Sequence, residues 1–490
     1  MMEEKTYMHM ASKIRQRVRT IYTNDGECDD MNTFLHLLLY ANDLEIEGIV
    51  YSSSCFHYEG DPENGVPPKR WARPDWMWEH LKAYEEVYPN LAAVDPSYPS
   101  PDHLRSITAI GNVKNVGEMD EVTAGSELIR KNLLRDVPGK VYIQIGGGTN
   151  TVARALRSIE EEYRKSPGWE SIHAAVSRRT VLVMILAQDD TYRDYISKVW
   201  PDIETVFCSA IGPVAFLWGE RRNPQEALRT YAGSWMREHL LERGPLMARY
   251  HTWGDGHHYD GEEWESQFGE NPAILDGAWW GKIPHQKNDM ISEGDSPAFL
   301  YLLDRGLRSL EEPSYGGWGG RYVWQAENTF CPEARFYGSA GDRNDLGIDE
   351  ASYALSRWIA DWMNDFAGRA AWSAGLDRNH RPEVTAEIRD KTAVPGEILE
   401  IGVRAFDPDG DAVALDAFVY GDAGTYAGTE RISCQLSFRE EEGRGILTVT
   451  VPEDAKSGDT IHVILRCRDS AGGEHPEYMT DYERVILTVA

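Results

Sequence analysis

The sequence lacks long hydrophobic runs, a leader-like segment and paired cysteines. No apolar stretch in the 490 residues approaches the ~20 needed to cross a bilayer, so we expect no membrane-spanning segment. Residues 1–19 are polar and mixed in charge, without the apolar middle of a secretory signal. This favours a cytoplasmic protein, although a signal cleaved earlier would leave the same sequence. The six cysteines form no Cys-x-x-Cys pair, which indicates reduced thiols.

The chain is also short of positive charge. Its 50 Lys and Arg face 80 Asp and Glu, for a formal net charge of −30. A field of that sign repels polyanions, which argues against nucleic acids and anionic membranes as partners. A neutral sugar and divalent cations remain compatible with it. The 16 Trp and 24 Tyr serve either core packing or the stacking of sugars.

Before residue 375, strand-like and helix-like segments alternate. The expected strands are residues 18–23, 46–52, 140–145, 180–187 and 204–209, and the expected helices are 32–41, 126–134, 149–164, 192–199, 297–305 and 357–368. Such alternation predicts an α/β domain with a mostly parallel sheet and helices on both faces. Ligands of these sheets bind at the carboxyl ends of the strands.

After residue 375 the helix signals disappear. Short alternating strands, such as 398–405, 445–451 and 460–468, are separated by turn sequences. This pattern is typical of an all-β, Ig-like sandwich. We therefore predict two domains, a catalytic α/β domain over residues 1–375 and an Ig-like β-sandwich over residues 376–490.

The segment Thr-Asn-Asp-Gly-Glu-Cys-Asp-Asp, residues 23–30, crowds four acids between the first strand and a helix. The acids are Asp25, Glu27, Asp29 and Asp30. Carboxylates so close repel one another unless a cation neutralises them. Hard oxygen ligands in a loop suit Ca²⁺, or Mg²⁺ with more water. The alternative is that Asp29 or Asp30 merely caps the helix.

Two further segments also precede expected helices. The segment Gln-Ile-Gly-Gly-Gly-Thr-Asn, residues 144–150, follows from the end of the strand expected at 140–145. The segment Ser-Glu-Gly-Asp-Ser-Pro, residues 292–297, places Asp295 just before the helix expected at 297–305. Glycines leave the backbone open to a ligand, and Pro is common in a first helical turn. An ordinary turn and an ordinary cap are the alternatives.

Together the three segments resemble the nucleoside hydrolase superfamily. The first loop of that family reads Asp-x-Asp-x-Gly-x-Asp-Asp, so that Asp25, Asp29 and Asp30 match while Thr23 and Glu27 depart from it. The Thr149-Asn150 pair matches the second motif and Asp295 the late aspartate. Gly294 stands where the family often has a histidine.

The amino-acid sequences of these segments, together with Tyr-Gly-Gly-Trp-Gly-Gly at 315–320, resemble those of a divergent branch of the superfamily. This is the DUF1593 group, also described as cellulose-binding-like proteins, in which such a domain is followed by a sandwich. The resemblance covers essentially the whole chain.

The resemblance implies one Ca²⁺ held by Asp25, Asp30, the Thr149 carbonyl and Asp295. A water on the metal would attack an anomeric carbon. Asp25 would act as general base, and Asp29 would share the catalytic work. Asp29 and Asp295 would bind sugar hydroxyls as the ring gains positive charge.

Five more residues are candidates for substrate contact: Asn150, Gln188, Asp189, His257 and Trp318. Helix capping is the alternative for Gln188 and Asp189, a plain surface position for His257, and a loop-pinning role for Trp318. The pair His257-His258, with Asp255 and Asp260 nearby, lacks a third spaced ligand for a transition metal.

The function expected from this is calcium-dependent hydrolysis of a glycosyl bond, N-ribosyl or related. The alternatives are a glycoside hydrolase acting on plant or bacterial carbohydrate and a non-catalytic, cellulose-like carbohydrate-binding protein. The expected partner is a small nucleoside or carbohydrate, and a homo-oligomer is possible.

Overall fold

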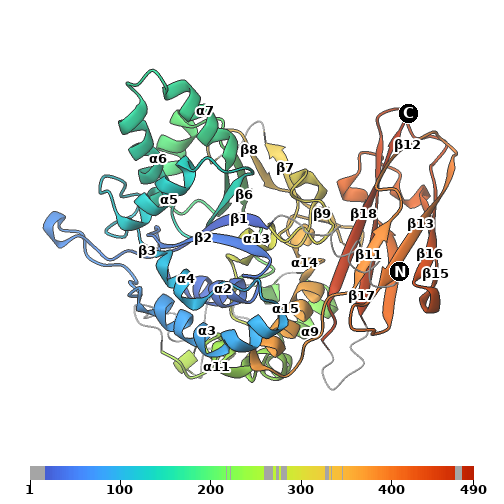
Figure 1. Ribbon diagram of the computed structural model, residues 1–490, viewed down its shortest axis with the longest axis horizontal. Helices are drawn as coiled ribbons and strands as arrows, with labels where there is room; N and C mark the ends of the chain where they lie inside the picture. The colour runs from blue at the N-terminus through green and yellow to red at the C-terminus, as the bar shows by residue number, and fades with distance from the viewer. Residues whose placement is uncertain are drawn as a thin grey trace.

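The computed structural model describes residues 17–490 apart from 217, 221, 259–268, 272–274, 277–283, 326–329, 333, 345 and 470–476. Its two parts, an α/β domain and a β-sandwich, lie side by side (Figure 1). Among the described residues, no helix combines the length and apolarity required to span a membrane.

The α/β domain is built on an eight-stranded sheet in the order β3-β2-β1-β4-β5-β6-β8-β7. All neighbours in it are parallel except β7 and β8. The strands are β1 (Val18–Asn24), β2 (Leu44–Tyr51), β3 (Thr108–Ile110), β4 (Val141–Ile145), β5 (Thr180–Ile185), β6 (Glu204–Cys208), β7 (Tyr322–Gln325) and β8 (Phe336–Ser339). The prediction of a mostly parallel sheet is confirmed.

Helices cover both faces of this sheet (Figure 1). The adjacent residues Ile21 and Tyr22 of β1 belong to different apolar clusters, because successive side chains of a strand point to opposite faces. The helices are α2 (Cys28–Leu39), α3 (Asp75–Val94), α4 (Pro101–Ser106), α5 (Ala124–Leu134), α6 (Asn150–Tyr163), α7 (Trp169–Arg179), α8 (Ser197–Val199), α9 (Gln225–Tyr231), α10 (Gly233–Met236), α11 (Gly244–Met247), α13 (Ser296–Leu300), α14 (Tyr353–Ser356) and α15 (Ile359–Ala374).

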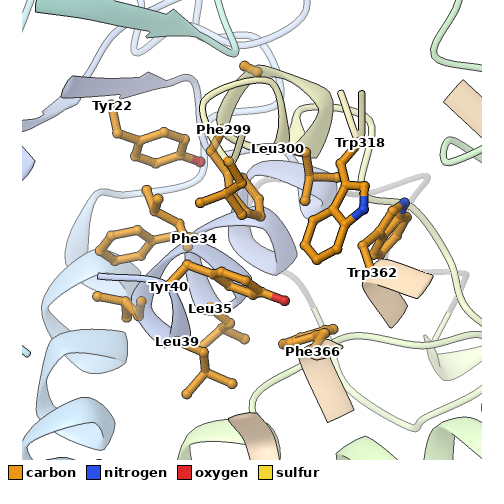
Figure 2. Close-up of a cluster of buried hydrophobic side chains, with 14 of the residues drawn as sticks. Tyr22, Phe34, Leu35, Leu39, Tyr40, Phe299, Leu300, Trp318, Trp362 and Phe366 are labelled. Carbon is orange, nitrogen blue, oxygen red and sulfur yellow. The ribbon is translucent and has the colours of Figure 1, made fainter. Parts of the chain in front are cut away.

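Helix α2 is buried along its whole length. A helix with no exposed face must lie within the core, and α2 contacts α3, α13 and α15. Phe34 of α2 and Tyr40, which follows the helix, lie among Phe299, Trp362 and Phe366 (Figure 2). This packing fixes the first turn of α2, which carries two of the predicted site acids, Asp29 and Asp30.

The C-terminal part is a sandwich of two four-stranded sheets, β11-β13-β16-β15 and β12-β18-β17-β14. Its strands are β11 (Glu383–Ala386), β12 (Asp390–Ala393), β13 (Ile398–Phe406), β14 (Val413–Val419), β15 (Ser433–Arg439), β16 (Arg444–Thr450), β17 (Thr460–Asp469) and β18 (Thr480–Val489); a small ladder, β9 (Asp342–Arg343) with β10 (Asp349–Glu350), belongs to the other domain. Buried and exposed residues alternate along β13, as in a sheet with one solvated face. The predicted Ig-like sandwich is confirmed.

The predicted boundary between residues 375 and 376 falls in the linker between α15 and β11. Gly375 ends α15 with a φ of +69°, a value that glycine adopts readily. The apolar cluster of the α/β domain also includes Tyr420, Ile464 and Tyr482 of the sandwich. The two domains are thus joined by a packed interface, and their ability to fold separately stays a prediction.

Candidate metal centre

The three predicted segments meet at the carboxyl ends of β1 and β4. Thr23 and Ile145 pair at the ends of these parallel strands. Gly26 then turns the chain into α2 with a φ of +78°, and a Cβ at this position would lie 2.2 Å from the Tyr51 hydroxyl oxygen. A Cβ on Gly146 would lie 2.6 Å from Asp30 Oδ1 and 3.1 Å from Asp295 Cγ. Glycine is therefore required where the backbone passes the acids.

Two groups of potential ligands result. Oxygens of Asp29, Asp30 and Asp295 lie within 4.8 Å of one another, and atoms of Asp25, Glu27 and His57 form a second such group. The exposed fractions of Asp25, Asp29, Asp30 and Asp295 are 1%, 7%, 1% and 4%. Four carboxyl groups are thus nearly withdrawn from water in one small region.

Burial and mutual repulsion control the ionisation of these acids. Burial, followed by the charges of neighbouring carboxylates, raises the pKa of Asp29, Asp30 and Asp295 well above the ordinary range. Burial also acts on Asp25, but the adjacent Asp30 carboxyl and His57 outweigh it and lower the pKa of Asp25. Full ionisation of the set would need a compensating positive charge.

The unpartnered oxygens fit a hard cation. Both carboxylate oxygens of Asp25 and Oδ1 of Asp30 are buried without a hydrogen-bond donor, which is costly for a carboxylate unless something else coordinates it. Asp30 Oδ2 accepts the Glu27 N–H at 3.0 Å, so Asp30 caps α2 with one oxygen and leaves the other available. The Thr149 carbonyl accepts the Ala153 N–H at 2.8 Å and keeps its second lone pair. Such oxygens are the ligands that Ca²⁺ takes in proteins.

Two of the expected sugar contacts, Asn150 and Asp189, make hydrogen bonds within the protein. The Asp189 carboxylate accepts the Thr149 hydroxyl at 2.8 Å and the Asn150 N–H at 2.9 Å. Asn150 Nδ2 donates to Ser53 Oγ and to the Asn112 carbonyl, both at 3.0 Å. The Asp189 carboxylate thus caps α6, and the Asn150 amide ties the strand-end loops together. Contact of either side chain with a sugar stays a prediction.

For Trp318 the structure favours the loop-pinning alternative. Its side chain is completely buried, its Nε1–H donates to the Tyr482 hydroxyl at 3.3 Å, and the Arg305 guanidinium lies 5.2 Å from its ring centroid. It therefore pins its glycine-rich loop against the sandwich and does not line a cleft.

Gln188 and His257 stay candidates for substrate contact. Gln188 Nε2 donates to the Gly146 carbonyl, while its Oε1 is buried without a partner. The His257 side chain is 55% exposed and lines a cavity of about 890 Å³.

Sequence reasoning missed His57 and Glu293. His57 Nδ1 lies 3.5 Å from Asp25 Oδ2, and its side chain is fully buried. Glu293 accepts the Tyr250 hydroxyl at 2.6 Å and lies 2.7 Å from His36 Nδ1, which fixes the turn before Asp295. His57 follows β2, so the rule that sites form at strand carboxyl ends could have indicated it. Glu293 stands inside the quoted motif.

A parallel α/β sheet with buried acids at its strand ends, joined to a C-terminal sandwich, defines a nucleoside hydrolase-like protein. Residues 19–322 match the family model described as "Cellulose-binding Sde182, nucleoside hydrolase-like domain". Residues 400–489 match "Cellulose-binding protein Sde0182, C-terminal domain". The chain belongs to this Sde182 family of nucleoside hydrolase-like proteins.

One solved structure resembles the chain over both domains. It is a nucleoside hydrolase-related hypothetical protein from Saccharophagus degradans, described as associated with carbohydrate metabolism, with 23% identity over 97% of this chain and 100% of that one, at a TM-score of 0.69. This likeness shows the shared fold. The GspB Siglec domain matches 23% of this chain and 58% of its own, at 17% identity and a TM-score of 0.18. The BIgI domain of the beta protein from S. agalactiae matches 22% of this chain and 96% of its own, at 20% identity and a TM-score of 0.16. No curated protein matches the chain.

Proposed function

We propose that this protein is a calcium-dependent hydrolase that cleaves a glycosyl bond in a carbohydrate. The observation that carries the proposal is the buried set of carboxylates at the strand ends, with three oxygens that have no donor. The cellulose-binding description of the family and the carbohydrate association of the S. degradans relative favour a glycoside over a ribonucleoside.

The residues that fit Ca²⁺ are Asp25, Asp30, Asp295 and the Thr149 carbonyl. When bound, the cation would acidify and orient the attacking water. Asp25 would take the proton of that water as general base. Asp29 is the most exposed of the four acids and would bind a sugar hydroxyl, an interaction that strengthens as the ring gains positive charge.

The leaving-group acid common in the superfamily has no room here. A Cβ on Gly294 would lie 2.3 Å from Asp29 Oδ2, so a histidine at this position would displace Asp29. Protonation of the leaving group must come from another residue. His57 is too deeply buried to reach a leaving group directly, and its contact with Asp25 suits it to positioning that base.

The second candidate function is carbohydrate binding without catalysis. It is favoured by the hydrogen bonds of Asn150 and Asp189 within the protein, because two side chains expected to hold the sugar already have partners there. In that case the calcium would order the strand ends and the sugar would bind elsewhere.

A release assay distinguishes these functions. The full-length protein with Ca²⁺ is incubated with nucleosides in one panel and with nitrophenyl glycosides and oligosaccharides in another. We expect glycoside turnover that EDTA abolishes and that Asp25→Asn removes. The exposed Asp202 provides a matched control as Asp202→Asn. Base release from nucleosides alone would overturn the carbohydrate assignment. Sugar binding without turnover in either panel would establish the binding-protein alternative.

A further inference from the structure

A third group of potential metal ligands lies in the loop after α11. His251, Asp255 and His257 bring ligand atoms within 4.8 Å of one another. Asp255 Oδ2 lies 3.2 Å from His257 Nδ1 and 3.8 Å from His251 Nδ1. The ligand that the sequence pattern lacked is thus His251, whereas Asp260 lies outside the described residues.

The two printed separations are close to those within a zinc site. With metal–ligand bonds of about 2.0–2.1 Å, neighbouring ligands of a tetrahedral zinc ion lie roughly 3.3 Å apart. The contact between Asp255 and His257 already has this spacing, and that between Asp255 and His251 needs to close by only a few tenths of an ångström. Two imidazoles and one carboxylate suit zinc and other first-row divalent cations.

The backbone around these ligands is held in place. The His251 N–H donates to Asn32 Oδ1 at 2.8 Å, and Asn32 Nδ2 donates to the carbonyls of His251 and Ser292, both at 3.0 Å. Asn32 is fully buried in α2. The His251 backbone is therefore attached to α2, the helix that begins at the buried carboxylates of Asp25, Asp29, Asp30 and Asp295, here called the acid centre. Ligands fixed in this way lose little entropy on binding a metal.

The Asp255 carboxylate is oriented by its own loop. Its Oδ1 accepts the His257 N–H at 2.8 Å, and its Oδ2 accepts the Thr252 N–H at 3.1 Å. Both bonds come from backbone groups, so Oδ2 stays directed at the two imidazoles. An oxygen that accepts one N–H can also bind a cation through its other lone pairs.

Space for an exchangeable ligand adjoins the group. His251 and His257 line the cavity of about 890 Å³, together with Trp76, Arg249 and His258. Three protein ligands beside open space are typical of catalytic zinc sites, which keep one position for water or substrate, whereas structural sites are closed by four ligands.

The geometry points to a second metal centre, in which His251, Asp255 and His257 bind one Zn²⁺-class divalent cation and leave a coordination position facing the cavity. This centre differs from the acid centre in its ligands. It has two imidazole nitrogens and one carboxylate, whereas the side-chain ligands of the acid centre are all carboxylates. It does not depend on the proposed hydrolase activity.

Cobalt provides the probe, because Co²⁺ bound by imidazole in a four-coordinate site gives visible absorption bands. Metal-free, full-length protein is titrated with Co²⁺ in excess Ca²⁺, which occupies the acid centre. We expect one equivalent to bind, the bands to appear, and Zn²⁺ to displace the cobalt. His257→Gln should weaken the binding at least tenfold, and His251→Gln likewise.

His258→Gln is the matched control, since His258 lines the same cavity and lies beside His257 but pairs with Glu270. It should leave cobalt affinity unchanged, and so should Asp295→Asn in the acid centre. Absence of stoichiometric binding in the wild type would overturn the proposal. So would equal weakening by His257→Gln and His258→Gln in variants whose circular dichroism matches the wild type.

Discussion

Buried acids in two regions of this molecule, the strand ends and the domain interface, differ in their partners. At the strand ends, Asp25 and Asp30 keep oxygens without a donor. At the domain interface, Asp361 of α15 is equally buried but accepts the Tyr482 hydroxyl at 2.5 Å and Arg468 Nε–H at 2.9 Å. Burial alone therefore does not distinguish a binding site from a structural network.

The difference lies in how the charge is compensated. The charge of Asp361 is neutralised by Arg466 and Arg468 of β17, and its oxygens also accept hydrogen bonds from the Tyr478 and Tyr482 hydroxyls. The acids at the strand ends face mainly one another, and burial, followed by their mutual repulsion, raises the pKa of three of them. A fully partnered buried acid stabilises the fold, whereas a set of acids that repel one another indicates a ligand from outside the chain.

The largest effect on stability is expected for Asp361→Asn. The change leaves Arg468 and Arg466 at the interface without their shared carboxylate, and loss of one partner of a buried pair costs about 3–5 kcal/mol. The two arginines are partly exposed, so we expect a value of about 3 kcal/mol. Urea denaturation of the full chain measures the free energy of unfolding.

Asp416→Asn is the control for this change, because Asp416 binds the same Arg466 at 2.9 Å but its side chain is 49% exposed. It should cost less than about 1 kcal/mol. Equal costs for the two variants would show that the interface network does not stabilise the fold as argued.

The next effect concerns calcium and pH. Because the folded-state pKa of Asp29, Asp30 and Asp295 is raised, their protonated forms favour the native state, and that stability is lost as pH rises above the ordinary carboxyl pKa of about 3.9. In EDTA, the free energy of unfolding should therefore fall between pH 5 and pH 8, by about 1.4 kcal/mol per pH unit for each proton involved. Calcium at 100 times its dissociation constant should restore about 2.7 kcal/mol at pH 8.

Thermal denaturation with and without Ca²⁺ at several pH values checks this. Asp295→Asn removes one repelling charge and one ligand. It should be more stable than wild type in EDTA at pH 8 and respond less to Ca²⁺. A wild-type protein indifferent to both calcium and pH would contradict the assignment of a cation to these acids.

The sequence predicted five strands of the sheet, β1, β2, β4, β5 and β6, but not β3, β7 and β8. The five were found because a buried strand leaves a local run of apolar residues. Strands expected at 18–23 and 140–145 occur at Val18–Asn24 and Val141–Ile145. The convergence of the three motifs followed from topology, since parallel strands present their carboxyl ends at one edge. The helix expected at 297–305 is shorter, Ser296–Leu300, and the chain then continues in turns with positive φ at Arg305 and Gly306.

The hydrogen bonds of Asn150 and Trp318 depend on partners distant in sequence. Asn150 donates to Asn112, 38 residues away, and Trp318 to Tyr482, 164 residues away. A local sequence pattern does not indicate which residue will become the hydrogen-bond partner of a polar or aromatic side chain. For the same reason the sequence could not show that His251 would join Asp255 and His257, because that contact depends on the fold of an irregular loop.

The smallest change in stability, with the largest change in function, is expected for Asp29→Asn. Asp29 is the most exposed of the four acids, and its carboxylate accepts the Ser292 hydroxyl at 3.2 Å, a bond that an amide oxygen can also accept. Loss of one repelling charge offsets any weakening of that bond, so the free energy of unfolding in Ca²⁺ should change by less than about 1 kcal/mol. Turnover of the glycoside identified in the release assay should nevertheless disappear, because the amide lacks the negative charge that stabilises the developing positive charge on the sugar. Parallel measurement of unfolding and of initial rates separates the two effects. An active Asp29→Asn variant would remove Asp29 from the catalytic set, while an inactive variant with unchanged calcium affinity would place its contribution on the sugar and not on the metal.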